Sequence, residues 1–259
     1  MVIRMDSTKS VVTLTFGDSA ENHVGMEQIG TMVASGNGYT IEDLVELQRV
    51  LEVESELIDL DQEGTPLASV LILRKGVEFL FRNASTPYTA LDLFEEQIGL
   101  NVDKHAYMYG RVVNKKARWN LCFDDESREP DYASGKGRII GTGTVPLTSC
   151  LIHQIETTFG PKAKGLKGEG NYYYDIAKCG IGFHGDSERR KVIAVRLGAS
   201  MPLHYQWFKD GKPFGHRMIL PLHGGDMYIM SEKAVGTDWK KSSIYTLRHA
   251  TGCEAFTTI

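Results

Sequence analysis

Apolar residues recur along this chain in short runs, and the spacing within each run predicts a strand or a helix. Residues 11–16 read as a strand that a Gly-Asp pair ends. Residues 41–51 carry apolar side chains at helical spacing behind a Thr-x-x-Asp start signal, and a second helix is expected from 89 to 99. Between them, 67–73 and 77–81 flank a polar Arg-Lys-Gly segment and predict a hairpin. The first hundred residues are therefore expected to form an αβ region.

From about residue 105 the pattern changes to short strands separated by Gly-rich turns. One helix is predicted at 146–159, because a Pro stands at its start and a Gly follows its end. The strand candidates after it are 171–176, 181–186, 191–197, 203–208, 217–222, 226–230 and 244–249. Seven or eight short strands with no helix between them predict a β-sandwich or a jelly-roll. The expected fold class is α+β, with residues 1–100 as an N-terminal αβ region of unknown role and residues 101–259 as a β-rich domain.

Composition and charge narrow the possible classes of protein. With 259 residues, of which 42% are hydrophobic, the chain can bury a substantial core. Its formal net charge of −4 argues against a surface dedicated to non-specific polyanion binding, while a local basic groove stays possible. No apolar run approaches the roughly 18 residues of a membrane span, and the four cysteines form no CxxC pair. We therefore expect an intracellular protein of a reducing compartment, cytoplasmic or nuclear, that does not enter membranes.

The triplet His184-Gly185-Asp186 is the strongest chemical signal in the chain. A His and a carboxylate two residues apart on one strand point to the same side, since side chains alternate between faces. Together with one remote His they would form the two-His-one-carboxylate triad, which holds Fe(II) and leaves coordination positions open for a co-substrate and O₂. The triplet therefore predicts a metal centre with room for further ligands.

Several ordered pieces around this triplet carry a family resemblance. Tyr174 precedes the triplet by ten residues and Glu188 follows it by two. An apolar strand at 192–198 and a Gly-Asp-Met-Tyr-Ile-Met segment at 225–230 come later. That order, over about residues 105–252, resembles the AlkB-type Fe(II)/2-oxoglutarate-dependent dioxygenases.

The resemblance implies a fold, an activity and cofactors. It implies a double-stranded β-helix (jelly-roll) catalytic core, to which the N-terminal αβ region would be an extension. It implies Fe(II), 2-oxoglutarate as co-substrate and O₂, with oxidative demethylation or hydroxylation of a nucleic-acid base, as in the repair of damaged DNA. Single-stranded or damaged nucleic acid is the partner that it suggests, and some members of the family modify RNA or protein instead.

The remote His of the triad is expected to be His249. It lies 63 residues after Asp186, within the spacing that the resembled family tolerates, and it follows an apolar strand. Three other histidines, His204, His216 and His223, lie too close along the chain for the strand crossing that this fold needs. A second alignment stays open, in which residues 242–248 match the later family strand that carries an arginine, and then the distal ligand would be missing.

The far carboxylate of 2-oxoglutarate needs a cation, and Arg196 is the residue we favour. It lies on the apolar run 192–197, where a charge is costly unless it is paired. The resembled family places its arginine downstream of the distal His, where this chain has no basic residue after His249. Arg248 is the rival, although strand alternation would aim it away from its neighbour His249. By the resemblance, Tyr174 donates a hydroxyl to the same carboxylate, and Tyr172 stands where the family usually has Asn.

Substrate recognition is expected around Glu188, which occupies a position from which some AlkB relatives hydrogen-bond the target base. A carboxylate suits a cationic methylated base. The Gly-rich loop 124–145 and the lysines of 162–167 are candidates for clamping an unpaired strand, with stacking faces offered by Tyr107, Tyr109 and Tyr132. Two alternatives remain: a protein or small-molecule hydroxylase on the same fold, and a jelly-roll binding module without iron chemistry.

Overall fold

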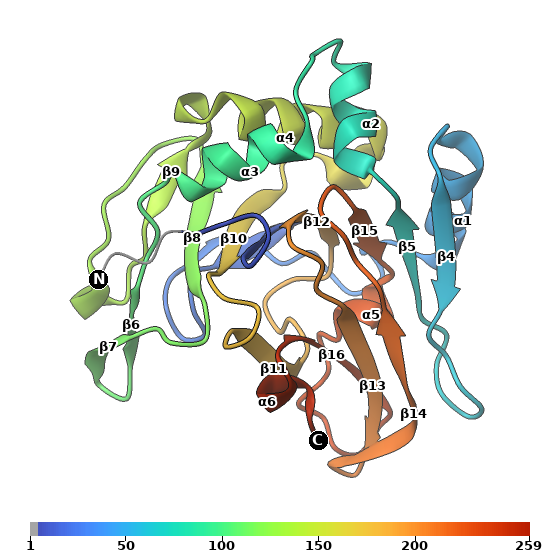
Figure 1. Ribbon diagram of the computed structural model, residues 1–259. Coiled ribbons are helices and arrows are strands. Elements are labelled where there is room, and N and C mark those ends of the chain that lie inside the picture. The colour runs from blue at the N-terminus through green and yellow to red at the C-terminus, as the bar shows by residue number, and fades with distance from the viewer. Residues whose placement is uncertain (1–4) are drawn as a thin grey trace.

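The computed structural model describes residues 5–259 as a mixed α+β protein that consists mostly of β-sheet. A large sheet and a small sheet pack against each other, and helices cover the other face of the large sheet (Figure 1). The expected α+β class is confirmed. None of the helices in the described range is both long and apolar enough to cross a membrane.

The large sheet has eight strands, and only its last pair, β8 with β9, is parallel. In spatial order the strands are β4 (Ser55–Asp59), β5 (Ser69–Leu73), β15 (Met227–Met230), β12 (Val192–Gly198), β1 (Val11–Gly17), β10 (Lys167–Tyr173), β8 (Trp119–Asp124) and β9 (Ile139–Gly141).

Strand β1 lies in the middle of this sheet, paired with β10 on one side and β12 on the other. Its alternation assigns the two faces, because Leu14 and Phe16 are buried in the core beneath the helices while Thr13 and Thr15 face the small sheet. Since β1 lies in the middle of the large sheet and β5 pairs with β15 in the same sheet, the structure has no boundary at residue 100. The predicted division into 1–100 and 101–259 is therefore corrected to one continuous unit.

The small sheet lies opposite the inner face of β12 and β15. Its order is β11 (Gly180–His184), β16 (Thr246–Gly252), β13 (Leu203–Lys209) and β14 (Lys212–Leu220). Trp207 and Leu247 of this sheet share a buried core with Val192 and Tyr228 of the large sheet. The two sheets are therefore held together by apolar packing at one end, which leaves the polar end near β1 and β10 open to form a cavity.

Helices α2 (Gly76–Asn83), α3 (Ala90–Ile98) and α4 (Pro146–Thr158) cover the outer face of the large sheet, and α1 (Ile41–Val50) packs on β4 and β5 (Figure 1). A capping box starts α1, as its Thr-x-x-Asp signal predicted, and another starts α3, where the sequence predicted a helix. The predicted hairpin at 67–81 is wrong, since its second half is helix α2. Val77, Leu80 and Phe81 are buried at the i, i+3, i+4 spacing of a helix face.

The remaining elements are short. They are the hairpins β2 (Ser19–Glu21) with β3 (Gln28–Gly30) and β6 (His105–Met108) with β7 (Arg111–Asn114), the helices α5 (Glu232–Val235) and α6 (Glu254–Thr257), and the single turns η1 (Tyr132–Ser134), η2 (Thr142–Thr144) and η3 (Pro161–Ala163).

Candidate metal centre

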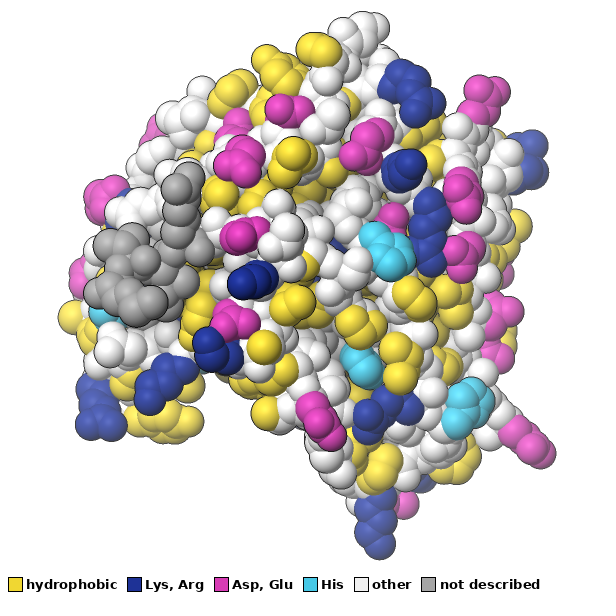
Figure 2. Space-filling view, viewed as in Figure 1, with side chains coloured by type: hydrophobic (Ala, Val, Ile, Leu, Met, Phe, Trp, Pro, Cys, Tyr) yellow, Lys and Arg dark blue, Asp and Glu magenta, His cyan; other side chains and the backbone are white. Residues whose placement is uncertain are grey.

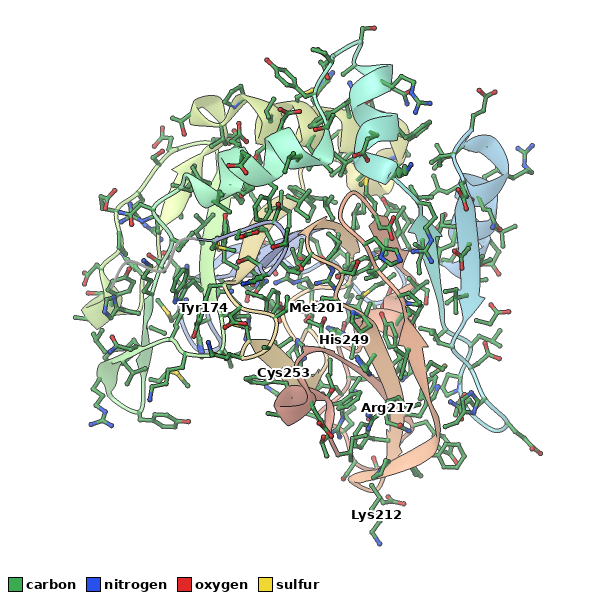
Figure 3. All side chains as sticks on the ribbon, viewed as in Figure 1. Tyr174, Met201, Lys212, Arg217, His249 and Cys253 are labelled. Carbon is green, nitrogen blue, oxygen red and sulfur yellow. The ribbon has the colours of Figure 1, made fainter. Side chains whose placement is uncertain are left out.

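The three predicted metal ligands meet at one point between the two sheets. His184 is the last residue of β11 and pairs directly with His249 of β16, while Asp186 follows β11 by two residues. The Nε2 atoms of both histidines lie 3.6 Å from Oδ1 of Asp186. One ligand atom from each residue lies within 4.8 Å of the others, which is close enough for a shared ion. Figure 3 shows His249 in the interior of the molecule.

Backbone contacts fix the loop that carries Asp186. Its amide donates to the carbonyl of Val235 at 3.0 Å, just before Gly236 ends α5. A Cβ on Gly185 would overlap the carbonyl oxygen of Gly236 and lie 2.7 Å from its carbonyl carbon. The middle residue of the triplet is therefore glycine because two backbone segments touch there.

The protonation of the site suits a divalent cation. Nδ1 of His184 lies 2.8 Å from the carbonyl of Gly182, so it carries the proton and Nε2 keeps its lone pair. Burial, followed by the neighbouring His249, lowers the pKa of His184 to about 3. Burial alone would raise the pKa of Asp186, but the contact with His249 and the charge of Arg189 outweigh it and hold that pKa well below its usual range. A neutral imidazole and a carboxylate anion are the protonation states that bind metals.

The triad opens into a cavity of about 820 Å³, whose walls come from both sheets and from the β2–β3 hairpin. This volume lies within the usual range for small-molecule sites. The wall combines apolar side chains with charged groups of both signs: Val192, Leu203, Met230 and Trp239 with Arg118, Arg189, Arg196, Glu21, Glu169 and Glu188.

Arg196 lines this cavity and is completely buried. Its Nη1 donates to the Thr13 hydroxyl at 2.8 Å across the β12–β1 pair. Nε and Nη2 have no hydrogen-bond partner within the described residues 5–259. These two N–H groups form one edge of the guanidinium, the fork that binds a carboxylate through two parallel hydrogen bonds. Arg248 stacks on Phe208 with 4.0 Å between the guanidinium and the ring centre, and it does not line the cavity.

The two tyrosines expected beside the co-substrate lie elsewhere. Tyr172 faces the helices, where its hydroxyl donates to Gln97 at 2.7 Å. Tyr174 follows the end of β10, stacks on Trp119 and donates to the carbonyl of Lys116 at 2.6 Å. Neither lines the cavity, so their predicted position is wrong. Alternation along β10 instead turns Tyr173 inward, because the glycines and Tyr172 occupy the face beneath the helices.

Glu188 lines the cavity, within a cluster of carboxylates that sequence reasoning did not find. Its Oε1 lies 2.7 Å from Arg189, and Glu169 of β10 contacts the same guanidinium at 2.5 Å. Glu21, at the end of β2, lines the cavity and has no ion-pair partner among the described residues. The polar alternation of β1 and β10 is the signal that could have identified this wall.

The predicted nucleic-acid clamp does not border the cavity. Tyr132 donates to Asp103 at 2.6 Å, and Lys162 and Lys167 form ion pairs with Asp43 and Asp124. Tyr109 is 88% exposed at the tip of the β6–β7 hairpin. On the face shown in Figure 2, basic and acidic side chains are interspersed without an extended patch of one sign.

The unpaired carboxylate of Glu21 gives a testable pH dependence. Burial first, then Glu188 and Glu169, raises its pKa from 4.5 to about 7. The folded protein therefore holds a proton that the unfolded chain releases between these values, so stability falls as pH rises through this window. Glu21→Gln is expected to remove this fall, because the side chain then carries no charge to be repelled by Glu188 and Glu169. At pH 8 the variant should be more stable than wild type by on the order of 1 kcal/mol, a small value because solvent screens this repulsion. Urea unfolding at several pH values from 4.5 to 8 measures the free energy of unfolding of both proteins. The prediction is wrong if this free energy changes with pH by the same amount in Glu21→Gln as in wild type.

The fold and the site thus define a β-rich α+β protein with a His-Asp-His cluster at the head of an internal cavity. No model of a known protein family matches the chain. The chain is 45% identical to an uncharacterized protein of Acanthamoeba polyphaga mimivirus over 262 residues, which cover 97% of this chain and 99% of that protein. The chain therefore belongs to the same family as this mimivirus protein.

Proposed function

We propose that this protein is an Fe(II)/2-oxoglutarate-dependent dioxygenase that oxidises a nucleic-acid base, most simply by removing an N-methyl group. The observation that carries the proposal is the shared cavity. His184, Asp186 and His249 converge at one place on its wall, and the same wall includes Arg196, whose buried guanidinium has one edge without a hydrogen-bond partner among the described residues. A two-His-one-carboxylate set is typical of non-haem Fe(II) oxygenases, and a buried arginine without a carboxylate is suited to a dicarboxylate ligand.

The strand order supports a double-stranded β-helix. Of the strands from β10 to β16, the large sheet contains β10, β12 and β15, and the small sheet contains the others in the order β11-β16-β13-β14. In an eight-stranded jelly-roll, the strand after β16 would complete the opposite sheet between β10 and β12. Here β1 occupies that place.

The presence of β1 at this place in the sheet accounts for the position of Arg196. Resembled AlkB enzymes carry their anchoring arginine after the distal His, on the strand whose place β1 takes here. That strand offers Thr13, whose Cα partner on β12 is Arg196. The Thr13 hydroxyl binds Nη1 and leaves the opposite edge of the guanidinium free. In this proposal the anchoring arginine therefore lies on β12, the neighbour of β1, and Thr13 of β1 orients it.

Each group has a definite task in this proposal. The two Nε2 atoms and one oxygen of Asp186 would hold Fe(II) from one side. Arg196 would bind the far carboxylate of 2-oxoglutarate, so that the acid's other end reaches the metal. When bound, iron and 2-oxoglutarate supply an O₂-derived oxidant that removes hydrogen from a C–H bond. The apolar residues Val192, Leu203 and Met230 limit water in the cavity, which protects reactive species from side reactions.

The acidic part of the cavity supports a cationic substrate group. Glu21, Glu169 and Glu188 line it, and Arg189 is the arginine that pairs with Glu169 and Glu188. An N-methylated base cation would form charge-assisted hydrogen bonds with a carboxylate here. A base must leave its stack to enter an internal cavity, so single-stranded or damaged nucleic acid is the form expected to react.

Anaerobic titration of the metal-free protein with Fe(II) and 2-oxoglutarate tests the proposal. We expect a visible charge-transfer band that appears only when both are present and is absent from His184→Ala. Incubation in air with methylated single-stranded DNA, RNA or peptide pools, followed by succinate measurement, then assigns the substrate class. A protein that gives no band with Fe(II) and 2-oxoglutarate would be a binding module, and turnover of peptides alone would make it a protein hydroxylase.

Arg196→Met is expected to weaken 2-oxoglutarate binding about 10- to 100-fold, because two charge-assisted hydrogen bonds are lost. Iron binding should change little, since Arg196 contacts none of the three ligands. Calorimetric titration of the Mn(II)-loaded protein measures the dissociation constant. Arg217→Met is the control, because Arg217 binds the carbonyl of Thr257 and does not line the cavity. Equal affinity in wild type and Arg196→Met would exclude this anchor.

A further inference from the structure

Arg189 is the most heavily engaged charge in the cavity wall. It is only 3% exposed, and its guanidinium contacts three carboxylates. Nη2 lies 2.5 Å from Glu169 and 2.7 Å from Glu188, and Nε lies 3.8 Å from Oδ2 of Asp186. A cation so deeply buried is retained only with such partners, because desolvation costs several kcal/mol per ion.

The two oxygens of Asp186 face different partners. Oδ1 lies 3.6 Å from both histidine Nε2 atoms, whereas Oδ2 lies on the side of Arg189. A carboxylate with both oxygens free can chelate an ion and fill two coordination positions. The 3.8 Å between Oδ2 and Nε of Arg189 is an ion-pair distance and not a hydrogen bond, since Nε donates to Oε1 of Glu188 at 2.7 Å. The charge of Arg189 therefore attracts Oδ2, while Oδ1 faces both histidines.

The fold restricts Arg189 from several directions. Glu169 reaches it from β10 in the large sheet, so the contact ties the triad loop to the opposite sheet. The backbone carbonyl of Arg189 accepts from Thr237 at 2.8 Å. Its stem passes over Gly17 of β1, where a Cβ would lie 2.9 Å from Cδ of Arg189. The glycine at the end of β1 therefore leaves the room that this side chain occupies.

We propose that Arg189 is a positioning residue of the metal centre: fixed by Glu169 and Glu188, its charge attracts Oδ2 of Asp186, favours binding through Oδ1 alone and thereby sets metal affinity and the number of open coordination positions. The proposal rests on the proposed metal centre. Groups that orient a metal ligand from outside typically contribute 10- to 100-fold in affinity. Glu169 takes part by fixing the guanidinium from the far side.

Co(II) binding to the metal-free protein tests this role, because Co(II) absorbs visible light in a way that reports its coordination. Arg189→Met is expected to bind Co(II) at least about 10-fold more weakly than wild type, with an altered spectrum as Oδ2 becomes free to bind. Arg189→Lys keeps the charge without the planar fork and should recover affinity only partly. Arg190→Met is the matched control, since Arg190 pairs with Glu232 and does not line the cavity.

Removing Arg189 leaves buried carboxylates unpaired, so folding is followed by circular dichroism and thermal unfolding without metal. Glu169→Gln keeps the guanidinium but removes its fixation, and it decides the question if Arg189→Met does not fold. For this variant we expect a smaller loss of Co(II) affinity with the same spectral change. Folded variants that bind Co(II) with the wild-type constant and spectrum would overturn the role of Arg189. A wild-type protein that does not bind Co(II) would instead overturn the proposed metal centre.

Discussion

Replacing His249 by alanine is expected to abolish the complex with Fe(II) and 2-oxoglutarate. His249 supplies one of three ligand atoms, and the described part of the chain offers no other His, Cys or carboxylate in that cluster. Even groups outside the ligand shell are worth 10- to 100-fold in affinity, so loss of a ligand should weaken Fe(II) binding by more than about 100-fold. The anaerobic charge-transfer band and the Fe(II) dissociation constant measure the effect.

His204→Ala is a close control for this prediction. His204 lies on the adjacent strand β13, is 8% exposed where His249 is 7% exposed, and does not line the cavity. Both substitutions remove a buried imidazole from the small sheet, but only one removes a ligand. If His249→Ala kept the band, or if His204→Ala lost it while remaining folded, the assignment of the triad would be wrong.

The triad was predictable from sequence because its geometry is mostly local. The spacing of two residues keeps His184 and Asp186 close along the chain, although the expected strand 181–186 ends at His184 and the bond from the Asp186 amide to Val235 holds the loop after it. The long-range step was the choice of His249. Alternation along the strand 192–197 likewise predicted the position of Arg196, because it puts Arg196 on the same face as Val192 and Ala194 and a charge on an apolar strand needs a partner. These inferences needed neither the sheet order nor the exact ends of the strands.

Predictions that depended on strand ends or on distant pairing failed. The resemblance implied a place for Tyr174 beside the co-substrate, whereas β10 ends at Tyr173 and Tyr174 stacks on Trp119 away from the cavity. The separate N-terminal region was inferred from a change in local pattern, which says nothing about β1 pairing with β10 more than 150 residues later. The run 77–81 is short and apolar, and such runs fit helix and strand equally well until the packing is known.

Arg189 and Glu21 could not be predicted as cavity residues for a related reason. Each is an ordinary charged residue in sequence, beside a turn, where exposure is the usual outcome. Their burial results from three segments meeting, namely the loop after β11, the end of β2 and the inner face of β10. The charge of the cavity is therefore a property of the tertiary structure.

Gly185→Ala is expected to weaken metal binding strongly although it alters no ligand. The new methyl group would overlap the carbonyl oxygen of Gly236, which itself has φ of +75° and lies against the Leu247 carbonyl of β16. Neither backbone segment can yield without separating the Asp186 loop from α5 and losing the bond from the Asp186 amide to Val235. Overpacking of this kind costs about 1–3 kcal/mol.

Gly185→Ala should lower Fe(II) affinity more than it lowers stability. A shift of Asp186 by about one ångström moves its carboxylate out of reach of an ion bound by the two histidines, whereas most of the core is unchanged. We expect a modest fall in the unfolding temperature and a loss of Fe(II) affinity above about 10-fold. Gly143→Ala is the control, since a Cβ there would contact nothing within 4 Å. A Gly185→Ala protein with wild-type Fe(II) affinity and stability would show that the close approach of the two glycines does not hold Asp186 in place.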